Sequence, residues 1–336
     1  MTKDQIDSIL TGFGTIAPGH KPLLEETHIS WVLLCGDYVY KIKKPLHLHF
    51  LDFSTPEKRK FYCERELALN RRLTDDIYLD VLPVVNHADG IFIGRRQGEI
   101  IDHAVCMRRM ESGRRMDILL KAGKVTTAQI DALAEKIAAF HRSARVIPDK
   151  DPGDIPEKFA DLISEERFLQ ENLDLEDPAC ISRAIRLSDA FCQKHTGRLK
   201  ERTRSGYVRD CHGDLHAKNI FLLSTPQPFD CIEFNDELRE IDVLNEIAFL
   251  CMDLDAAGRS DLSSRFLWSY HAVFPVMECE EDGQLLLYFK AYRANIRAKI
   301  NSLAARSAAN TEDKTAALAE SEKYLALMNT YLQKLK

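Results

Sequence analysis

A change from strand-like to helix-like residue patterns near residue 107 constrains the fold more than any other feature of this 336-residue chain. Before it, β-branched and aromatic runs predominate, and Gly36-Asp37 is a hairpin signal between two of them. From about residue 113, apolar residues follow helical spacing, as at Ile130, Leu133 and Ile137. The chain therefore predicts a small β-rich part followed by a larger helical part.

The expected elements follow from these patterns and from turn and cap residues. Strands are predicted at about 28–35, 38–44, 81–85, 91–94 and 101–107, and again at about 206–210, 220–223 and 229–234. A helix over about 54–73 has Ser54 or Thr55 as its cap and Pro56 in its first turn. Other helices fill most of the chain after residue 113. We expect an α+β, bilobal, kinase-like fold, with an N-lobe at 1–106, a hinge at 107–113 and a helical C-lobe at 114–336.

The stretch "CHGDLHAKNIFLL", Cys211 to Leu223, lies between predicted strands and has the spacing H-x-D-x-x-x-x-N. This is the spacing of a kinase catalytic loop, in which the aspartate accepts a hydroxyl proton and the asparagine holds a divalent metal. Asp214 and Asn219 occupy those positions. Downstream, Asp230 lies in a predicted strand and is a candidate second ligand, because Mg²⁺ prefers hard oxygen atoms. Glu233 is a weaker candidate.

Two upstream features complete this order. Lys41 and Lys43 share one face of a predicted strand, and Glu66 lies on the helix face that we expect to meet it. A lysine at this place can pair with the phosphates of a nucleotide, with a glutamate to position it. Each feature alone is common on solvated surfaces, but the order lysine, glutamate, H-x-D-x-x-x-x-N, aspartate favours phosphoryl transfer.

The segment "HGDLHAKN" resembles the catalytic loop of the aminoglycoside phosphotransferase and choline kinase superfamily, which reads H-G-D-L-H-x-x-N. Gly213 and His216 stand where protein kinases usually have arginine and lysine. With "ETHISWVLLCGDYVYKIKKP", "LDFSTPEKRKFYCERELALNRRL" and "FDCIEFNDELREIDVLNEIAFLCMDL", the resemblance covers about residues 20–330 and is to a bacterial branch of this superfamily.

The resemblance implies a small-molecule kinase that uses ATP or GTP with Mg²⁺. It implies Asp214 as the catalytic base, and Asn219 and Asp230 as metal ligands. Lys41 and Glu66 would position the phosphates, and Met110, in the hinge, would lie along the adenine. His212 would orient the catalytic loop, and Asp242 would brace it from the start of a helix.

Two departures from the family pattern bear on this reading. The chain has no G-x-G-x-x-G over the phosphates, so we expect Thr27, Ser30 and their neighbouring backbone N–H groups to do part of that work. Members of this branch often carry a C-terminal P-loop domain, whereas this sequence has no G-x-x-x-x-G-K-[ST]. A separate P-loop protein is therefore a candidate partner.

Composition excludes some classes of function. A net charge of -6 argues against a nucleic-acid binder. Nine cysteines without a C-x-x-C pair predict buried free thiols in a reducing compartment. The polar N-terminus is unlike a signal peptide, and no apolar run approaches the roughly 20 residues of a membrane helix. We expect a cytoplasmic protein that binds no membrane.

Three other functions stay open at this point. A kinase-shaped nucleotide-binding protein without turnover would keep the same residues. A protein kinase is disfavoured by Gly213 and His216, and by the short stretch between Asp230 and Asp242. A His/Asp metal phosphatase would need further histidines or a G-N-H segment, and the sequence has no G-N-H.

We expect the acceptor to be a small hydroxyl compound. Two groups of charged residues give opposite predictions of its charge. From Asp230 to Asp255 there are nine acidic residues against Arg239 alone, which favours a cationic acceptor. A basic stripe of Arg293, Arg297 and Lys299 would favour an anionic one. We expect this stripe to be a solvated helix face.

Overall fold

The computed structural model describes residues 1–16, 22–48, 51–95 and 97–335. The chain divides into two compact units, a first one of Met1–Ala122 with Lys218–Leu238 and a second one of Gly123–Ala217 with Arg239–Lys336. The first unit holds the large sheet and the second is mostly helical, which confirms the predicted α+β class. Residues 218–238 group with the sheet, although they fall in the predicted C-lobe. The lobe bounds, with a hinge at 107–113, stay predictions.

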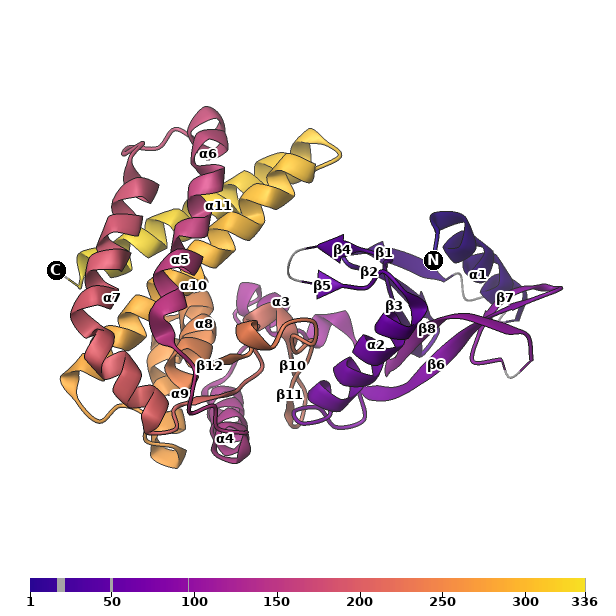
Figure 1. Ribbon diagram of the computed structural model, residues 1–336, viewed down its shortest axis with the longest axis horizontal. Coiled ribbons are helices and arrows are strands. Elements are labelled where there is room, and N and C mark those ends of the chain that lie inside the picture. Colours follow the sequence, from indigo (N-terminus) through magenta and orange to yellow (C-terminus); the bar gives the residue numbers. More distant parts are fainter. Residues whose placement is uncertain (17–21, 49–50, 96, 336) are drawn as a thin grey trace. The chain divides into compact units, whose positions relative to one another are not determined.

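A six-stranded antiparallel sheet forms the first unit, in the order β1-β2-β3-β8-β6-β7 (Figure 1). Its strands are β1 (Leu23–Glu26), β2 (Ser30–Cys35), β3 (Tyr38–Lys43), β6 (Tyr78–His87), β7 (Gly90–Ile93) and β8 (Glu99–Arg108). Gly36 adopts φ +59° in the turn between β2 and β3, a conformation that glycine reaches at low cost. The predicted strands of this half are confirmed with shifted ends, and β1 is an additional exposed edge strand.

Two helices pack on opposite faces of this sheet. Helix α1 (Lys3–Ile16) places Ile6 and Ile9 in a core cluster with Ala104, whereas Cys63 of α2 (Pro56–Asn70) belongs to a cluster with Val105. Because neighbouring strand residues point to opposite faces, the two helices cover opposite sides. Helix α2 begins where the sequence predicts, and its cap is Thr55, whose hydroxyl accepts the N–H of Lys58 at 3.3 Å.

The segment 218–238 contains a short hairpin and an irregular stretch. Strands β10 (Ile220–Leu222) and β11 (Pro226–Pro228) pair antiparallel. The strand predicted at 229–234 is wrong, because Asp230 has φ +63°, which interrupts an extended chain. Its N–H and that of Cys231 donate to side chains, Tyr78 Oη at 3.1 Å and Asn70 Oδ1 at 2.9 Å, in place of a neighbouring strand.

The remaining elements of the first unit are short. They are β4 (His47–Leu48), β5 (Leu51–Asp52), the 3-10 turns at Ser112–Arg114 and Asp236–Leu238, and α3 (Met116–Lys121). A further 3-10 turn, Ala217–Asn219, spans the boundary between the units.

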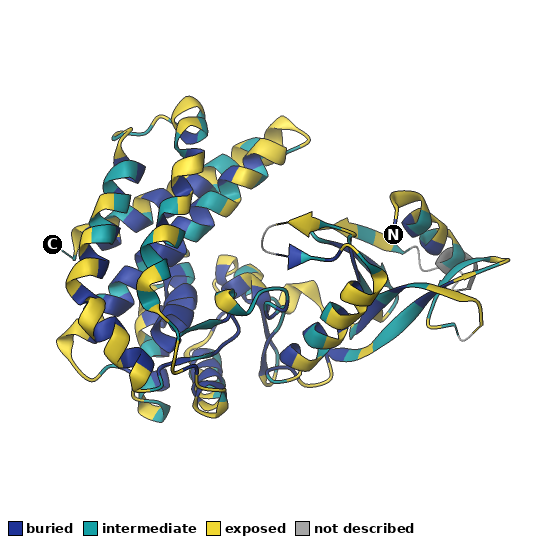
Figure 2. Ribbon diagram, viewed as in Figure 1, coloured by how far each residue is buried: buried dark blue, intermediate teal, exposed yellow. Residues whose placement is uncertain are grey.

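The second unit is built around helix α8 (Val243–Ala256), which is buried over most of its length (Figure 2). Its sequence is apolar on nearly every side, as expected of a helix enclosed by others, and α9 and α10 pack against it. The other helices are α4 (Thr127–Ser143), α5 (Ile155–Ala160), α6 (Glu166–Asn172), α7 (Cys180–Arg204), α9 (Ser260–Val273), α10 (Glu280–Ser307) and α11 (Thr311–Gln333). The two-stranded pair β9 (Val208–Asp210) and β12 (Glu240–Asp242) precedes α8, and 3-10 turns lie at Pro152–Asp154 and Asp161–Glu165.

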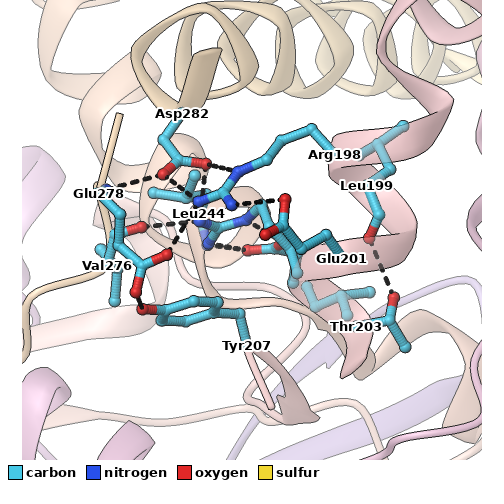
Figure 3. Close-up of polar contacts among 12 residues, drawn as sticks. Arg198, Leu199, Glu201, Thr203, Tyr207, Leu244, Val276, Glu278 and Asp282 are labelled. Carbon is cyan, nitrogen blue, oxygen red and sulfur yellow. Dashed lines mark hydrogen bonds and ion pairs between the residues drawn. The ribbon is translucent and has the colours of Figure 1, made fainter. Parts of the chain in front are cut away.

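Two buried arginines of α7 form hydrogen bonds with carboxylates at the starts of α8 and α10. Arg202 donates from Nε to Asp242 Oδ2 at 2.7 Å and from Nη1 to Asp282 Oδ1 at 3.0 Å. Arg198 binds Asp282 with two nitrogens, at 2.9 and 2.7 Å, and its neighbours Glu278 and Tyr207 complete the group (Figure 3). We call Arg198, Arg202, Asp242 and Asp282 the arginine network.

Two further observations concern whole classes of residue. Within the described ranges, no helix is both long and apolar enough to cross a membrane. Seven of the nine cysteines are buried, whereas Cys35 is partly exposed and Cys279 is exposed, and all nine are free thiols.

Candidate functional site

Two lysines on β3 and three carboxylates form a cluster in the first unit. Lys41 and Lys43, two residues apart, point to the same face of the strand, toward α2. Lys41 Nζ lies 2.8 Å from Glu66 Oε1 and 2.7 Å from Asp230 Oδ1. The expected contact between Lys41 and Glu66 is therefore present, and Asp230 joins it.

The second lysine continues this cluster inward. Lys43 Nζ lies 2.7 Å from Glu66 Oε2 and also binds Glu233. The side chain of Lys43 is 0% exposed, that of Lys41 is 13% exposed and that of Asp230 is 43% exposed. We call Lys41, Lys43, Glu66, Asp230 and Glu233 the lysine cluster; it is closed at Lys43 and open to solvent at Asp230.

Ion pairing keeps Lys41, Lys43 and Glu66 charged despite their burial, whereas burial raises the pKa of Glu233. Burial by itself raises the pKa of Glu66, but the ammonium groups of Lys41 and Lys43 outweigh it and lower that pKa. Burial likewise lowers the pKa of each lysine, and the neighbouring carboxylates more than reverse this effect. Glu233, which the sequence favours weakly as a metal ligand, is bound to Lys43 and buried, so the structure does not support that role.

The β10–β11 hairpin brings the two expected metal ligands to the same end of one element. Asn219 precedes β10 and Asp230 follows β11, and the N–H of Phe229 donates to the carbonyl of Asn219 at 2.9 Å. Both side chains offer the hard oxygens that Mg²⁺ prefers, and the carboxylate of Asp230 is accessible. These residues fit a magnesium site, which Asn219 and Asp230 would share.

The catalytic-loop sequence folds as a tight turn in the second unit. Gly213 has φ +88°, a left-handed conformation that most side chains disfavour. His212 is buried, and its Nδ1 accepts the N–H of Asp214 at 3.2 Å. His216 Nε2 lies 3.3 Å from Asp214 Oδ2. His212 thus binds the backbone within the loop, its role in orienting the loop stays a prediction, and His216 contacts the candidate base directly.

Glu246 is a residue of this site that sequence reasoning missed. Its carboxylate accepts the N–H of His212 at 2.7 Å and the N–H of Gly213 at 3.0 Å. Glu246 lies one helical turn after Asp242, which caps α8 by accepting the N–H of Leu244 at 2.8 Å. Asp242 therefore supports the start of α8, whereas Glu246 is the carboxylate that binds the loop. A glutamate inside the apolar run "EIAFL" was the available signal.

The surroundings of Asp214 hold it in the ionised form. Burial acts to raise the pKa of Asp214, but the charge and hydrogen bond of His216, followed by His212 and Arg297, lower it well below its usual range. An ionised aspartate can accept a proton. The side chain of Asp214 is 33% exposed, so a ligand can reach it.

The expected nucleotide contacts outside the lysine cluster are placed as follows. Thr27 and Ser30 close the turn between β1 and β2, where the N–H of Ser30 donates to Thr27 Oγ1 at 2.9 Å. Ser30 is fully buried, so the structure does not support a phosphate contact from its hydroxyl. Met110 follows the end of β8 and packs against the cluster around Tyr78 and Val105. The roles of Thr27 and Met110 toward a nucleotide stay predictions.

Comparison with known proteins supports the fold. No family model matches the chain. The uncharacterized protein Rv2004c of Mycobacterium tuberculosis (strain H37Rv) is 31% identical over 321 residues, which cover 92% of this chain and 59% of that protein. The chain thus spans little more than half the length of this relative.

Two solved structures are similar over nearly the whole chain. A choline kinase from Cryptosporidium parvum Iowa II has a TM-score of 0.50 at 12% identity, covering 98% of this chain and 92% of its own. The GDP complex of an aminoglycoside 2'-phosphotransferase-IIIa variant has a TM-score of 0.51 at 15% identity, covering 96% of each chain. At these identities the likeness concerns the fold, and it confirms the resemblance at that level. The chain therefore has the protein-kinase-like fold that choline kinases and aminoglycoside phosphotransferases share.

Proposed function

We propose that this protein is a nucleotide- and Mg²⁺-dependent phosphotransferase that moves a γ-phosphate to the hydroxyl group of a small molecule. The observation that carries the proposal is the position of Lys41, whose ammonium group binds both Glu66 and the partly exposed Asp230. A kinase nucleotide site combines a lysine, a glutamate and a metal-binding aspartate in this way, so these contacts support the proposal. GDP in one structure of similar fold supports either ATP or GTP as the donor.

The lysine cluster would position the nucleotide. Glu66 is fully buried and holds Lys41, whose ammonium group would contact the α- and β-phosphates. Asn219 and Asp230 would hold Mg²⁺, which neutralises charge on the phosphates when it is bound.

Asp214 would act on the acceptor. As the acceptor oxygen bonds to the γ-phosphorus, the bond from that phosphorus to the β–γ bridging oxygen breaks, and the nucleoside diphosphate leaves. The acceptor proton passes to Asp214. A carboxylate of low pKa is a weak base, which suits a loose transition state in which the hydroxyl loses its proton late. His216 keeps the carboxylate ionised and oriented.

An acceptor screen tests this function. Purified protein with ATP–Mg²⁺ or GTP–Mg²⁺ is offered sugars, amino sugars, choline-like alcohols, nucleosides and hydroxy acids, and phosphorylated product is measured. We expect one class to accept phosphate, and Asp214→Asn to lower kcat by roughly 10²–10⁴-fold, the usual effect of losing a catalytic base. Nucleotide affinity should stay close to that of the wild type.

Asp261→Asn is the matched control, because Asp261 belongs to the same unit, is 63% exposed and pairs with Arg259 on the surface. Its kcat should be unchanged. Nucleotide binding without transfer to any acceptor, and without an effect of Asp214→Asn, would favour a kinase-fold binding protein that has no turnover. Phosphate incorporation into lysate proteins would favour a protein kinase.

A further inference from the structure

Helix α10 carries two buried arginines where the sequence favours a solvated face. Arg293 is 5% exposed and Arg297 is 7% exposed, so that expectation is wrong for both. Four residues apart on one helix, they lie on the same face. Lys299 differs, since its side chain is 28% exposed and lies 3.4 Å from Asp161. The reason for the burial is that α10 packs against both α8 and α11.

These two arginines lack the partner that the other buried arginines have. Arg59 pairs with Asp102, Arg239 with Asp210, and Arg198 and Arg202 with the carboxylates of the arginine network. Among the residues that the structure describes, no carboxylate oxygen lies within 4.0 Å of Arg293 or Arg297. Burying a guanidinium removes its hydration, and a well-packed protein normally offsets this cost with a direct ion pair.

The contacts of Arg293 place this pair beside the catalytic loop. Its Nε donates to Asn245 Oδ1 at 2.7 Å, and its Nη1 donates to the carbonyl of Gly213 at 3.2 Å. Gly213 immediately precedes Asp214, so Arg293 is a positioning residue for the loop. Its guanidinium also stacks at 4.7 Å over the ring of Phe249.

Arg297, one turn further along, has a hydrogen bond with Tyr324 and feels the charges of Asp253 and Asp214, but it forms no ion pair within the described residues. Its guanidinium lies 5.4 Å from the ring centre of Tyr324, and its buried Nε finds no hydrogen-bond acceptor in the described part of the chain. Asp253, a nearby carboxylate, already accepts from Tyr324 Oη at 2.8 Å and from the N–H of Ala217 at 2.9 Å. Arg297 and Asp214 influence each other electrostatically.

The acidic run that favoured a cationic acceptor is used within the protein. Six of its members bind basic side chains: Asp230 with Lys41, Glu233 with Lys43, Asp236 with Arg65, Glu240 with Arg145, Asp242 with Arg202 and Asp255 with Lys290. Glu246 and Asp253 accept backbone N–H groups. Most of the negative charge in this run therefore already has a partner, whereas the positive charge of Arg297 has no carboxylate within ion-pair distance among the described residues.

We propose that the hydroxyl compound phosphorylated by this protein carries an anionic group, a carboxylate or a phosphate, and that Arg297 binds that group. The planar guanidinium matches both anions with two parallel hydrogen bonds. This inference rests on the proposed function, because it assigns the acceptor of that reaction. An anion on Arg297 would give its buried Nε the acceptor that it lacks and would hold the acceptor hydroxyl near Asp214.

Acceptors matched in size and differing in charge test the proposal. Glycerol is compared with glycerate, and glucose with glucose 6-phosphate, in the presence of ATP–Mg²⁺. We expect transfer to the anionic member of a pair. Arg297→Gln should lower kcat/KM for that acceptor by roughly 10–100-fold, mainly through KM, as expected for a lost charged hydrogen bond. Arg297→Lys should restore part of it.

Inorganic phosphate provides a readout that needs neither nucleotide nor turnover. We expect phosphate to raise the Tm of the wild type and of Arg306→Gln, a control on the same helix whose side chain is 52% exposed. The shift should disappear in Arg297→Gln. Without phosphate, Arg297→Met should melt no lower than the wild type, because it removes an unpaired buried charge.

The outcomes separate this proposal from the proposed function. Transfer to neutral or cationic acceptors only, unaffected by Arg297→Gln, would overturn the anionic acceptor and leave the kinase intact. A phosphate response lost in Arg297→Gln, with no transfer to any acceptor, would support the anion site and count against the kinase. A raised KM for ATP, with that for the acceptor unchanged, would assign Arg297 to the γ-phosphate and overturn the proposal.

Discussion

The lysine cluster of the first unit and the arginine network of the second are both buried ionic groups that join distant parts of the sequence. Lys41 brings Glu66 and Asp230 together, and Arg202 brings Asp242 and Asp282 together. They differ in the residues that join these distant segments, although Arg198 also pairs with the exposed carboxylates of Glu201 and Glu278 at the edge of its network. The side chains of Arg202 and Asp282 are both 0% exposed, whereas that of Asp230 is 43% exposed.

This difference separates a structural contact from a site that can exchange partners. Removing one partner of a fully buried ion pair leaves an uncompensated charge, so such a pair affects mainly the free energy of unfolding. An ion pair with one exposed member can give up that member to a ligand of the same charge. Asp230 and Lys41 are such a pair, and under the proposed function a phosphate would replace the carboxylate on the lysine.

Breaking the closed network should have the largest effect on stability. Arg202→Met leaves Asp242 and Asp282 without the guanidinium that both of them bind. We expect the free energy of unfolding to fall by roughly 3–5 kcal/mol, the usual cost of uncompensated buried charge. Denaturant titration measures it. Arg204→Met, an exposed arginine on the same helix, is the control, and equal losses in both variants would contradict the comparison.

The two lysines of the lysine cluster should have different roles: Lys43 should matter mainly for stability and Lys41 mainly for nucleotide binding. Lys43→Met should lower the free energy of unfolding by about 3 kcal/mol, because Glu66 and Glu233 are buried with it. Lys41→Met should cost less stability, since Asp230 is exposed and Glu66 keeps Lys43. It should instead raise the Kd for ATP by roughly 10-fold or more. Denaturant titration and calorimetry measure the two effects, and similar profiles for both variants would show that exposure does not distinguish them.

The buried carboxylate of Glu246, whose pKa burial raises despite the charge of Arg293, extends the comparison to pH dependence. Burial raises the pKa of Glu246 to about 7, although Arg293 and the N–H groups of His212 and Gly213 oppose this. In Asp282, by contrast, the arginines overcome burial and lower the pKa to about 2. Between the ordinary value of 4.5 and about 7, the folded chain therefore holds a proton that the unfolded chain has released.

Stability should consequently fall as pH rises through this window. We expect the wild type to lose roughly 1–3 kcal/mol between pH 5 and pH 8 relative to Glu246→Gln, since one pKa unit corresponds to about 1.4 kcal/mol. Glu322→Gln, on an exposed position of α11, should follow the wild type. Unfolding titrations at both pH values measure the difference, and a parallel loss in Glu246→Gln would assign the pH dependence to other groups.

Local sequence patterns predicted the helices and strands well, but they did not predict the surroundings of individual residues. Period-two runs and the Gly36 turn give β2 and β3, and the spacing of Lys41 and Glu66 anticipates their contact. The irregular backbone at Asp230 escaped prediction, because its N–H groups bind side chains far away in the sequence. The apolar residues on both sides of Asp230 predict a strand, and the sequence gives no sign of the positive φ at Asp230 itself.

Burial of charge was the least predictable property. Arg293 and Arg297 read as solvated because a charged residue on a helix usually is, and only the packing of α10 between α8 and α11 shows otherwise. Glu246 likewise sits in an apolar helix, and tertiary structure alone brings it to the catalytic loop. Both cases depend on contacts between segments that are far apart in sequence.

The hold of Glu246 on the catalytic loop has a consequence for how this protein tolerates change. Its carboxylate binds main-chain N–H groups, at His212 and Gly213, which every amino acid except proline carries. Glu246 therefore supports the backbone at these two positions whatever side chains they carry, whereas the positive φ of Gly213 and the His212 side chain depend on the residues of the loop itself. We expect substitutions at His216 to change the pKa of Asp214 while Glu246 keeps its hold on the N–H groups of His212 and Gly213.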